Sequence, residues 1–228
     1  GVRNLLAPEG VFVFEVAYGM GQVRHGYFDS LLYHEHYDAH TVRPLRMMLF
    51  TRCLMRLFRV EHVTTHGGSI RGYVCSHDAS WTDDEMGLDA WEQEENSKAL
   101  DDGLRSLQRR IHDGRSALRT LLDKIKPARV VGYGAPAKMT PFCYAMGLTC
   151  ADVEYVVDDS PLKQGRYSPG LHFPIVSAET LFKRLPAYVI VFPWNIGDAI
   201  VAKIKTMFLE RRLAPPKCII ALPELRVV

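Results

Sequence analysis

The sequence of 228 residues has no long hydrophobic run, no signal-peptide core and no marked excess of charge of either sign. No apolar stretch approaches the roughly 18 residues that a transmembrane helix needs, so we expect no membrane partner. The 28 basic and 26 acidic residues leave a formal net charge of +2. Such a balance does not predict binding to nucleic acid, which depends on strongly basic patches.

Cysteine is also scarce. The five cysteines are widely spaced and form no Cys-x-x-Cys pair. This pattern argues against a disulfide framework and a cysteine-rich zinc site, and it predicts a protein of the reducing cytoplasm. The remaining composition is that of a globular protein, with 47 % hydrophobic and 24 % charged residues. At roughly 150 residues per domain, the length predicts about one and a half domains.

Hydropathy patterning predicts alternating strands and helices. The first block contains a strand at 10–16, a helical pattern at 44–58 and a two-stranded hairpin at 60–75. A long amphipathic helix is predicted at 100–125, and residues 126–228 alternate short apolar strands with helices. This alternation is typical of α/β proteins, in which helices cover both faces of a parallel sheet.

The densest polar cluster is Tyr33-His34-Glu35-His36. Its imidazoles, carboxylate and phenol supply a base that titrates near neutral pH, an orienting group and a hydrogen-bond donor. His34 and His36 would share a face in an extended segment, whereas on a helix they would not. The His-x-His spacing also allows a metal site, although no third ligand at a fixed spacing supports it. A solvated loop is the third interpretation.

Residues 132–138, Gly-Tyr-Gly-Ala-Pro-Ala-Lys, follow a predicted strand and open a predicted helix. The two glycines permit a tight turn and a close approach of backbone amides to a phosphate, and Lys138 adds a positive charge. The pattern also satisfies the dinucleotide-binding motif, in which Asp158 or Asp159 at the end of the next strand would bind a ribose. Glycines that merely turn the chain are an equally simple interpretation.

Two further loops follow strands of the predicted sheet. The loop at 160–170 carries Lys163 and Arg166, which either meet a diphosphate at the carboxyl end of a parallel strand or lie in solvent. The segment Phe192-Pro193-Trp194-Asn195 ends another strand, and Asn195 is expected to cap the helix that follows.

Taken in order, five motifs resemble a known pattern. They are YHEH at 33–36, THGGSIR at 65–71, GYGAPAK at 132–138, VVDDSPLKQGRYSPG at 156–170 with His172 and Pro174, and PWN at 193–195. Over residues 10–224 the chain thereby resembles the sugar C-methyltransferases, S-adenosylmethionine-dependent enzymes of deoxysugar biosynthesis. These enzymes methylate carbon 3 of 4-keto-deoxysugar nucleotides.

The resemblance implies a domain organisation. Residues 1–77 correspond to the C-terminal half of a Rossmann-like methyltransferase domain, 78–125 to a helical linker and 126–228 to a second Rossmann-like, substrate-binding domain. The implied cofactor is S-adenosylmethionine, and the implied partner is a nucleotide-linked keto-sugar. The family's N-terminal zinc domain and glycine-rich cofactor loop find no counterpart here. We therefore expect the C-terminal portion of a longer enzyme, inactive in methyl transfer by itself because half of the cofactor site is absent. The sequence does not predict an oligomeric state.

The resemblance also implies residue roles. His36 corresponds to the base that removes the C3 proton. Glu35 orients the His36 imidazole or favours its charged form, and Tyr33 hydrogen-bonds to the substrate. The enolate formed beside the ketone then attacks the methyl group of the sulfonium. Substrate-binding roles are implied for Tyr133, Gly134, Lys138, Asp159, Lys163, Arg166, Tyr167, His172, Trp194 and Asn195. No residue is expected to bind a metal.

The chain departs from the family pattern at two places. Tyr37-Asp38-Ala39-His40 follows the YHEH cluster where the family has a hydrophobic–Ser–Tyr segment, and Met139-Thr140 replaces a favoured Gly-Asn. Two other functions compete with the methyltransferase. One is a non-catalytic NAD(P)- or nucleotide-binding Rossmann module, and the other is a metal-dependent enzyme centred on His34 and His36. The YHEH cluster favours the methyltransferase over the binding module, which has no use for it.

Overall fold

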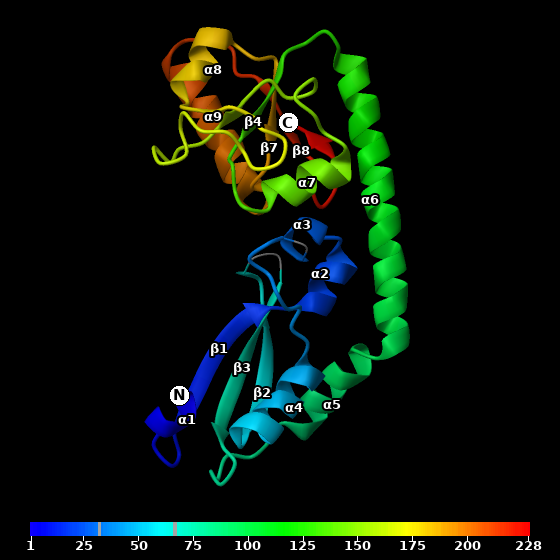
Figure 1. Cartoon of the computed structure of the whole chain (residues 1–228), viewed down its shortest axis with the longest axis vertical. Helices are drawn as coiled ribbons and strands as arrows, with labels where there is room; N and C mark the ends of the chain where they lie inside the picture. The colour runs from blue at the N-terminus through cyan, green and yellow to red at the C-terminus, as the bar shows by residue number, and fades with distance from the viewer. Residues whose placement is uncertain (32, 66–67) are drawn as a thin grey trace. The chain divides into compact units, whose positions relative to one another are not determined.

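The computed structural model describes residues 1–31, 33–65 and 68–228 (Figure 1). The chain forms two compact units, which we call the first and the second unit. The first comprises Gly1–Tyr27 and His36–Leu107, and the second comprises Phe28–Glu35 and Gln108–Val228. The second unit therefore includes a short segment from the early part of the chain. The predicted domains at 1–77, 78–125 and 126–228 have other boundaries and stay a prediction.

The first unit is built on a three-stranded sheet with the order β1-β3-β2, in which both pairings are antiparallel. Its strands are β1 (Val11–Ala17), β2 (Met55–Val63) and β3 (Ser69–Ser76), and its helices are α1 (Val2–Leu5), α2 (Gly19–His25), α4 (Val42–Cys53) and α5 (Glu85–Glu94). The sheet packs against α4 and α5 through a core that includes Leu49, Leu57 and Leu88. The antiparallel pairing of β2 with β3 confirms the predicted hairpin. Gly67, which the prediction placed in its turn, lies outside the described residues.

The predicted helix at 44–58 is too long. Helix α4 ends at Cys53, Leu54 adopts a left-handed conformation with φ of 52°, and Met55 begins β2. Met55 and Leu57 enter the core from alternate positions of this strand. Near-helical spacing of a few apolar residues does not distinguish a helix from the strand that follows it, because short apolar runs fit both periods.

The second unit contains a six-stranded sheet with the order β6-β5-β4-β7-β8-β9. The strands are β4 (Val130–Tyr133), β5 (Val156–Val157), β6 (Ile175–Val176), β7 (Tyr188–Val191), β8 (Lys217–Ile220) and β9 (Arg226–Val227). The helical elements are α3 (Phe28–Leu31), α7 (Met139–Met146), α8 (Glu179–Arg184), the 3-10 turn η2 (Trp194–Ile196) and α9 (Gly197–Glu210). All pairings are parallel except that of β8 with β9. The predicted α/β class with a parallel sheet is therefore confirmed.

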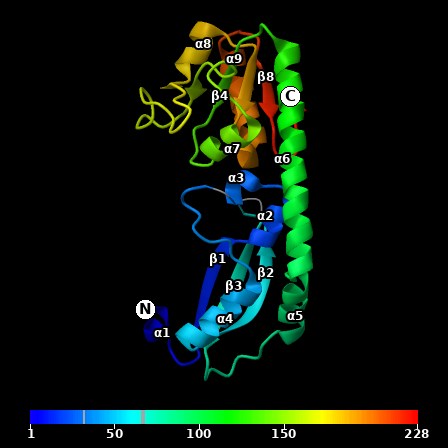
Figure 2. The same ribbon diagram turned by 45° about the vertical axis from the view of Figure 1, so that its right-hand side comes forward.

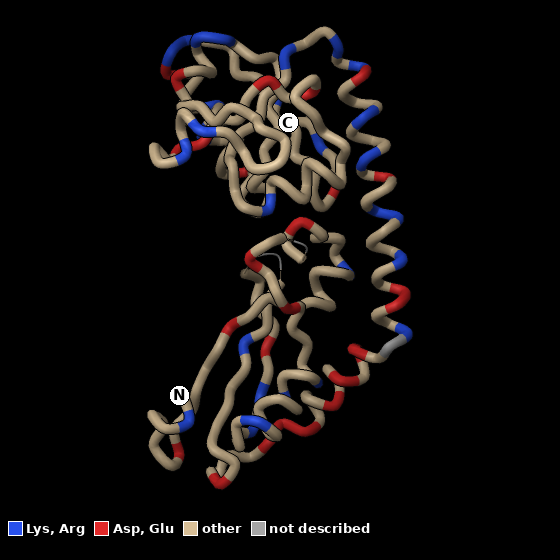
Figure 3. The backbone as a smooth tube through the Cα atoms, in the orientation of Figure 1, with Lys and Arg blue, Asp and Glu red and all other residues tan. Residues whose placement is uncertain are grey.

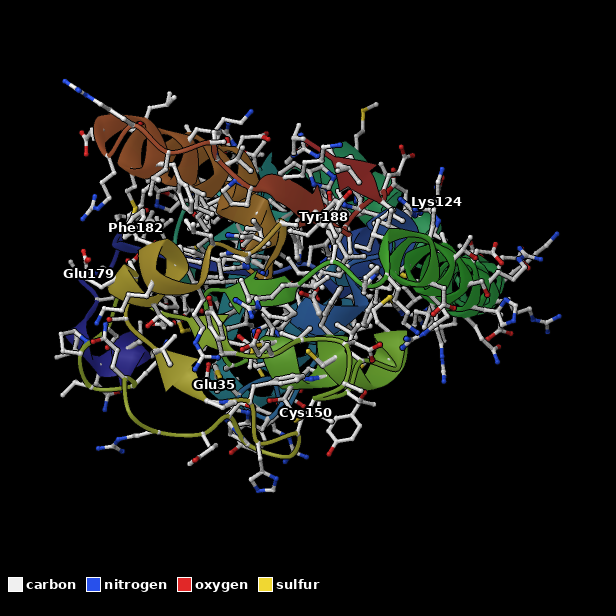
Figure 4. All side chains as sticks on the ribbon, turned by 90° about the horizontal axis from the view of Figure 1, so that it is seen from above. Glu35, Lys124, Cys150, Glu179, Phe182 and Tyr188 are labelled. Carbon is white, nitrogen blue, oxygen red and sulfur yellow. The ribbon has the colours of Figure 1, made fainter. Side chains whose placement is uncertain are left out.

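Both faces of the parallel sheet are covered, which explains why its strands are apolar throughout. One face packs on α8 and α9 through Leu181, Ile200, Ile204 and Phe208, while α7 lies on the other side in Figures 1 and 2. Phe182, which Figure 4 labels on α8, packs against Phe208 at a ring-centroid distance of 5.0 Å.

Helix α6 (Ser97–Ile125) confirms the amphipathic helix predicted at 100–125. Its residues up to Leu107 belong to the first unit and the rest to the second. Lys and Arg are interspersed with Asp along it in Figure 3, whereas α5 and the segment before it carry mainly acidic residues. Among the described residues, no helix combines the length and apolar character required to cross a bilayer.

Candidate functional site

A cavity of about 1040 Å³ opens in the second unit beside the carboxyl ends of β4 and β5. Carboxyl ends of parallel strands are where open α/β sheets usually bind ligands. The cavity is lined by the loop after α3, the β4–α7 turn, α7 and the loop after β5. The lining residues are Tyr33, His34, Glu35, Ala135, Pro136, Ala137, Met139, Thr140, Pro141, Tyr144, Lys163, Arg166, Tyr167, Ser168, Pro169 and Ile175.

The loop after α3 brings a phenol, an imidazole and a carboxylate to this cavity. Glu35, labelled in Figure 4, and His34 have side chains that are 61 % and 75 % exposed, and 3.9 Å separates His34 Nε2 from Glu35 Oε1. Partial burial and the charge of Glu35 raise the pKa of Tyr33, so its phenol stays protonated at neutral pH and can donate a hydrogen bond. His36, the next residue, is half-buried and belongs to the first unit.

The glycine turn after β4 uses its amides within the protein. Gly134 N–H donates to Val157 O at 2.6 Å, and Ala135 N–H donates to Asp158 Oδ2 at 2.7 Å. Gly134 has φ of 82°, and a Cβ at this position would lie 2.4 Å from Cγ of Pro193. This arrangement differs from the expectation that the turn amides approach a phosphate, because a tight turn against Pro193 accounts for the glycine.

The two acids at the end of β5 are likewise engaged. Asp158, 7 % exposed, also accepts a hydrogen bond from Ser160 N–H at 2.9 Å and pairs with Lys163 Nζ at 3.2 Å. Asp159 accepts hydrogen bonds from the Tyr133 hydroxyl at 2.9 Å and from Lys203 Nζ at 2.7 Å. Neither carboxylate is left to bind a ribose in the manner of a dinucleotide-binding acid, which weakens the NAD(P) alternative.

Comparison with known proteins identifies the family. Residues 64–223 match the family described as C-methyltransferase C-terminal domain. The chain belongs to this family. The chain is also 31 % identical to the C-methyltransferase NovU of Streptomyces niveus over 234 residues, an alignment that covers all of the chain and 54 % of that relative. The chain thus spans about half the length of the curated relative that it matches, and the predicted resemblance is confirmed.

Five residues with predicted roles line the cavity: Tyr33, Glu35, Lys163, Arg166 and Tyr167. Lys163 is held by the protein, since its Nζ donates to Ala135 O at 2.9 Å in addition to its pairing with Asp158. Among the described lining residues, Arg166 is the cation whose guanidinium has no protein partner. Arg166 is therefore the better candidate for an anionic ligand.

The other residues predicted to bind substrate lie outside the lining of this cavity. Tyr133 ends β4 and is buried in the core of the second unit, and His172 is exposed with φ of 55°. Lys138 donates to Asn195 Oδ1 at 3.0 Å, and its Nζ lies 4.6 Å from the centroid of the Trp194 ring. Asn195 was expected to be a helix cap, but it lies within η2, where this contact with Lys138 occupies its side chain.

Sequence reasoning missed the cavity residues of α7. Thr140 and Tyr144 are four residues apart, so one face of this C-methyltransferase helix presents both to the cavity. Tyr144 is 58 % exposed, and Tyr167 on the facing loop is 65 % exposed. The position of α7 directly after the turn that follows a parallel strand was the signal that could have identified them.

No group of three or more His, Cys, Asp or Glu side chains arranged for a metal ion occurs within residues 1–31, 33–65 and 68–228. His34 and His36 are therefore not joined by a third described ligand.

Asp158→Asn is expected to lower the free energy of unfolding by about 2 kcal/mol at pH 7, because charge-assisted hydrogen bonds become neutral ones. Burial alone would raise the pKa of Asp158, but the amides of Ser160 and Ala135 and the charge of Lys163 outweigh it, so the pKa is lowered. A depressed pKa gives stability that is present above the unfolded-state pKa and lost as the pH falls through the folded one. Urea unfolding at pH 7 and at a series of lower pH values that passes through the lowered pKa of Asp158 measures this.

The control for this variant is Asp198→Asn, which removes a carboxylate that is 78 % exposed and pairs with Arg226. Exposed pairs contribute little to stability, so this change should have a small effect at either pH. Equal losses for the two variants at pH 7, or a loss for Asp158→Asn that persists in acid, would contradict the role given to Asp158.

Proposed function

We propose that the protein takes part in methyl transfer from S-adenosylmethionine to carbon 3 of a 4-keto-deoxysugar carried on a nucleoside diphosphate. The observation that carries this proposal is the cavity of the second unit, where the Tyr33–Glu35 loop meets the motifs at 132–138 and 160–170. A volume of about 1040 Å³ is large enough for a nucleotide-linked sugar. Membership of the C-methyltransferase family supports the class of reaction.

The substrate chemistry follows from the residue types. The ketone at C4 acidifies the C3 proton, and a base of near-neutral pKa is suited to remove it. In this proposal His36 is the base, as the family resemblance implies, Glu35 stabilises the imidazolium that forms, and the Tyr33 phenol donates a hydrogen bond to the ketone oxygen. The raised pKa of Tyr33 suits the donor role. The product of this step is an enolate whose C3 carbon is nucleophilic.

The methyl donor itself is a separate question. In the described part of the first unit the strands pair antiparallel throughout, whereas nucleotide cofactors of open α/β sheets bind at the carboxyl ends of parallel strands. The described residues of this unit therefore do not fit S-adenosylmethionine by themselves. The chemistry that this chain supports with its own residues is deprotonation of the substrate.

Deprotonation can be measured without the methyl donor. We expect the chain to exchange the C3 proton of a nucleoside-diphosphate 4-keto-deoxysugar for deuterium in D₂O, seen as loss of the C3 signal by NMR. Methylated product is not expected from the chain alone. If the C3 signal persists at the uncatalysed rate in the presence of stoichiometric protein, the proposed deprotonation by this chain is incorrect.

The diphosphate is expected to bind Arg166, with Tyr144 and Tyr167 as the flat aromatic walls that suit a nucleobase. Arg166→Ala should raise the Kd for a nucleoside diphosphate about 30-fold, because a charge-assisted contact to the phosphates is lost. Calorimetric titration measures this Kd. Arg110→Ala, which removes the same charge from an exposed position of α6, should leave it unchanged; equal weakening by both variants would point to non-specific charge attraction.

A further inference from the structure

Helix α3 is attached to the second unit at two adjacent residues. The ring of Phe28 stacks on Phe142 of α7 with a centroid distance of 6.2 Å and an interplanar angle of 9°. The next residue, Asp29, is 1 % exposed, and its Oδ2 accepts a hydrogen bond from Trp194 Nε1 at 2.7 Å. This hydrogen bond joins residues that are 165 positions apart in the chain. It fixes the start of α3 to the turn that follows β7.

Charge around Asp29 links this contact to the β4–α7 turn. Lys138 lies over the Trp194 ring and donates to Asn195 Oδ1. Burial raises the pKa of Asp29, and the charge of Lys138 and the Trp194 hydrogen bond offset part of that rise. Burial in turn lowers the pKa of Lys138, and the charge of Asp29 offsets part of that fall. The positive charge of Lys138 therefore favours the ionised form of Asp29.

Burying a carboxylate at this contact costs desolvation free energy, because the charge loses its hydration. An apolar residue would attach the helix without that cost. In return, the carboxylate fixes one orientation of α3 relative to Trp194, because the indole N–H must point at its acceptor. Helix α3 has only four residues and cannot hold itself in place without tertiary contacts. Tyr33, His34 and Glu35, which line the cavity, follow α3 closely in the sequence.

We propose that Asp29 is a positioning residue, which holds Tyr33 and Glu35 at the cavity through its hydrogen bond to Trp194. The role rests on the proposed function, because Tyr33 and Glu35 act there on the substrate. Asp29 itself is buried away from the substrate and takes no part in the proton transfer. Trp194 and Lys138, which are predicted from the sequence to contact the substrate, also take part in this attachment.

Trp194→Phe and Asp29→Ala each remove the hydrogen bond, and Asp29→Asn retains a carbonyl acceptor for the indole. We expect the first two to lower kcat for C3 deuterium exchange about 30-fold, the size of effect that a small misplacement of reacting groups produces. KM should stay within about twofold, because the diphosphate contact at Arg166 is untouched. Asp29→Asn should recover most of the rate. A rise in KM with unchanged kcat, or no difference between Asn and Ala, would overturn the positioning role.

A readout independent of activity is hydrogen–deuterium exchange of the backbone amides of residues 30–36, followed by mass spectrometry. Asp29→Ala should speed their exchange at least about tenfold, as expected when a local opening becomes easier. Arg166→Ala, which lies across the cavity, should not change it. Unchanged exchange in Asp29→Ala would overturn the proposal even if activity fell. If exchange speeds up but the wild-type chain leaves the C3 proton in place, the proposed function fails and the attachment of the loop by Asp29 stands.

The melting temperature separates positioning from general loss of structure. Burial raises the pKa of Asp29, so the ionised carboxylate destabilises the folded chain at pH 7. Asp29→Asn removes this charge, and the melting temperature at pH 7 should therefore stay the same or rise. Loss of activity in Asp29→Ala with a melting temperature within about 3 °C of the wild type is the expected combination. A large drop in the melting temperature of all three variants, with activity lost in proportion, would mean that the contact serves the fold alone.

Discussion

Replacement of His36 by alanine is expected to slow exchange of the substrate's C3 proton by about 10³-fold, the range that a positioned general base contributes. Alanine has no group that takes up a proton, and water would have to replace the imidazole. Substrate affinity should change little, because the cavity residues that face the diphosphate stay in place. The measurement is the initial rate of C3 deuterium exchange at saturating nucleotide sugar, compared with the wild-type chain at the same pH.

The matched control for His36 is His112, a histidine with an 80 % exposed side chain on α6. His112→Ala should keep the wild-type rate. Added imidazole should partly restore exchange in His36→Ala, since it supplies a base of similar strength to the vacated site. A wild-type rate in His36→Ala would show that another group removes the proton, and Glu35→Gln would then be the next variant to measure.

The parts of the fold that were predictable are those with a strong period. Helix α6 repeats apolar positions over 29 residues, and the strands of the second unit are uniformly apolar because both faces of their sheet are buried. The first unit was harder. Its strands were predicted, but the hydropathy pattern does not indicate whether they pair parallel or antiparallel. The left-handed Leu54 between α4 and β2 is also not predictable, because it is one leucine within an apolar run.

The sequence predicted which segments line the cavity. It predicted much less well which side chains of these segments pair with each other. Residues 33–35, 135–137 and 163–169, from three of the predicted motifs, do contribute to the cavity wall. Which of their polar groups remain open to a ligand depends on partners distant in sequence. Asp158 is occupied by Ala135 and Lys163, and Trp194 by Asp29, so these side chains support the loops. Sequence spacing alone does not show such pairings, because they are set by how the strands order in the sheet.

Gly134, in the turn after β4, is the site of a substitution with a large expected effect on stability. Gly134→Ala should lower the free energy of unfolding by about 3 kcal/mol, the sum of a left-handed conformation that disfavours Cβ and an overlap with a packed ring. The new Cβ would lie 2.4 Å from Cγ and 2.5 Å from Cδ of Pro193, and φ at this position is 82°. A proline ring is rigid, so it cannot rotate away as a flexible side chain would. Urea unfolding followed by circular dichroism measures the change.

Gly165→Ala separates the two contributions to that loss. Gly165 has nearly the same φ, 78°, but no described atom outside its own neighbours lies within 4 Å of its would-be Cβ. This variant should therefore lose only the conformational part, about 1 kcal/mol. The difference of about 2 kcal/mol between the two variants is the cost of the overlap with Pro193. If Gly134→Ala lost no more stability than Gly165→Ala, the close approach to Pro193 would not be what requires glycine in the turn, and a ligand contact of the turn backbone would again be the better explanation.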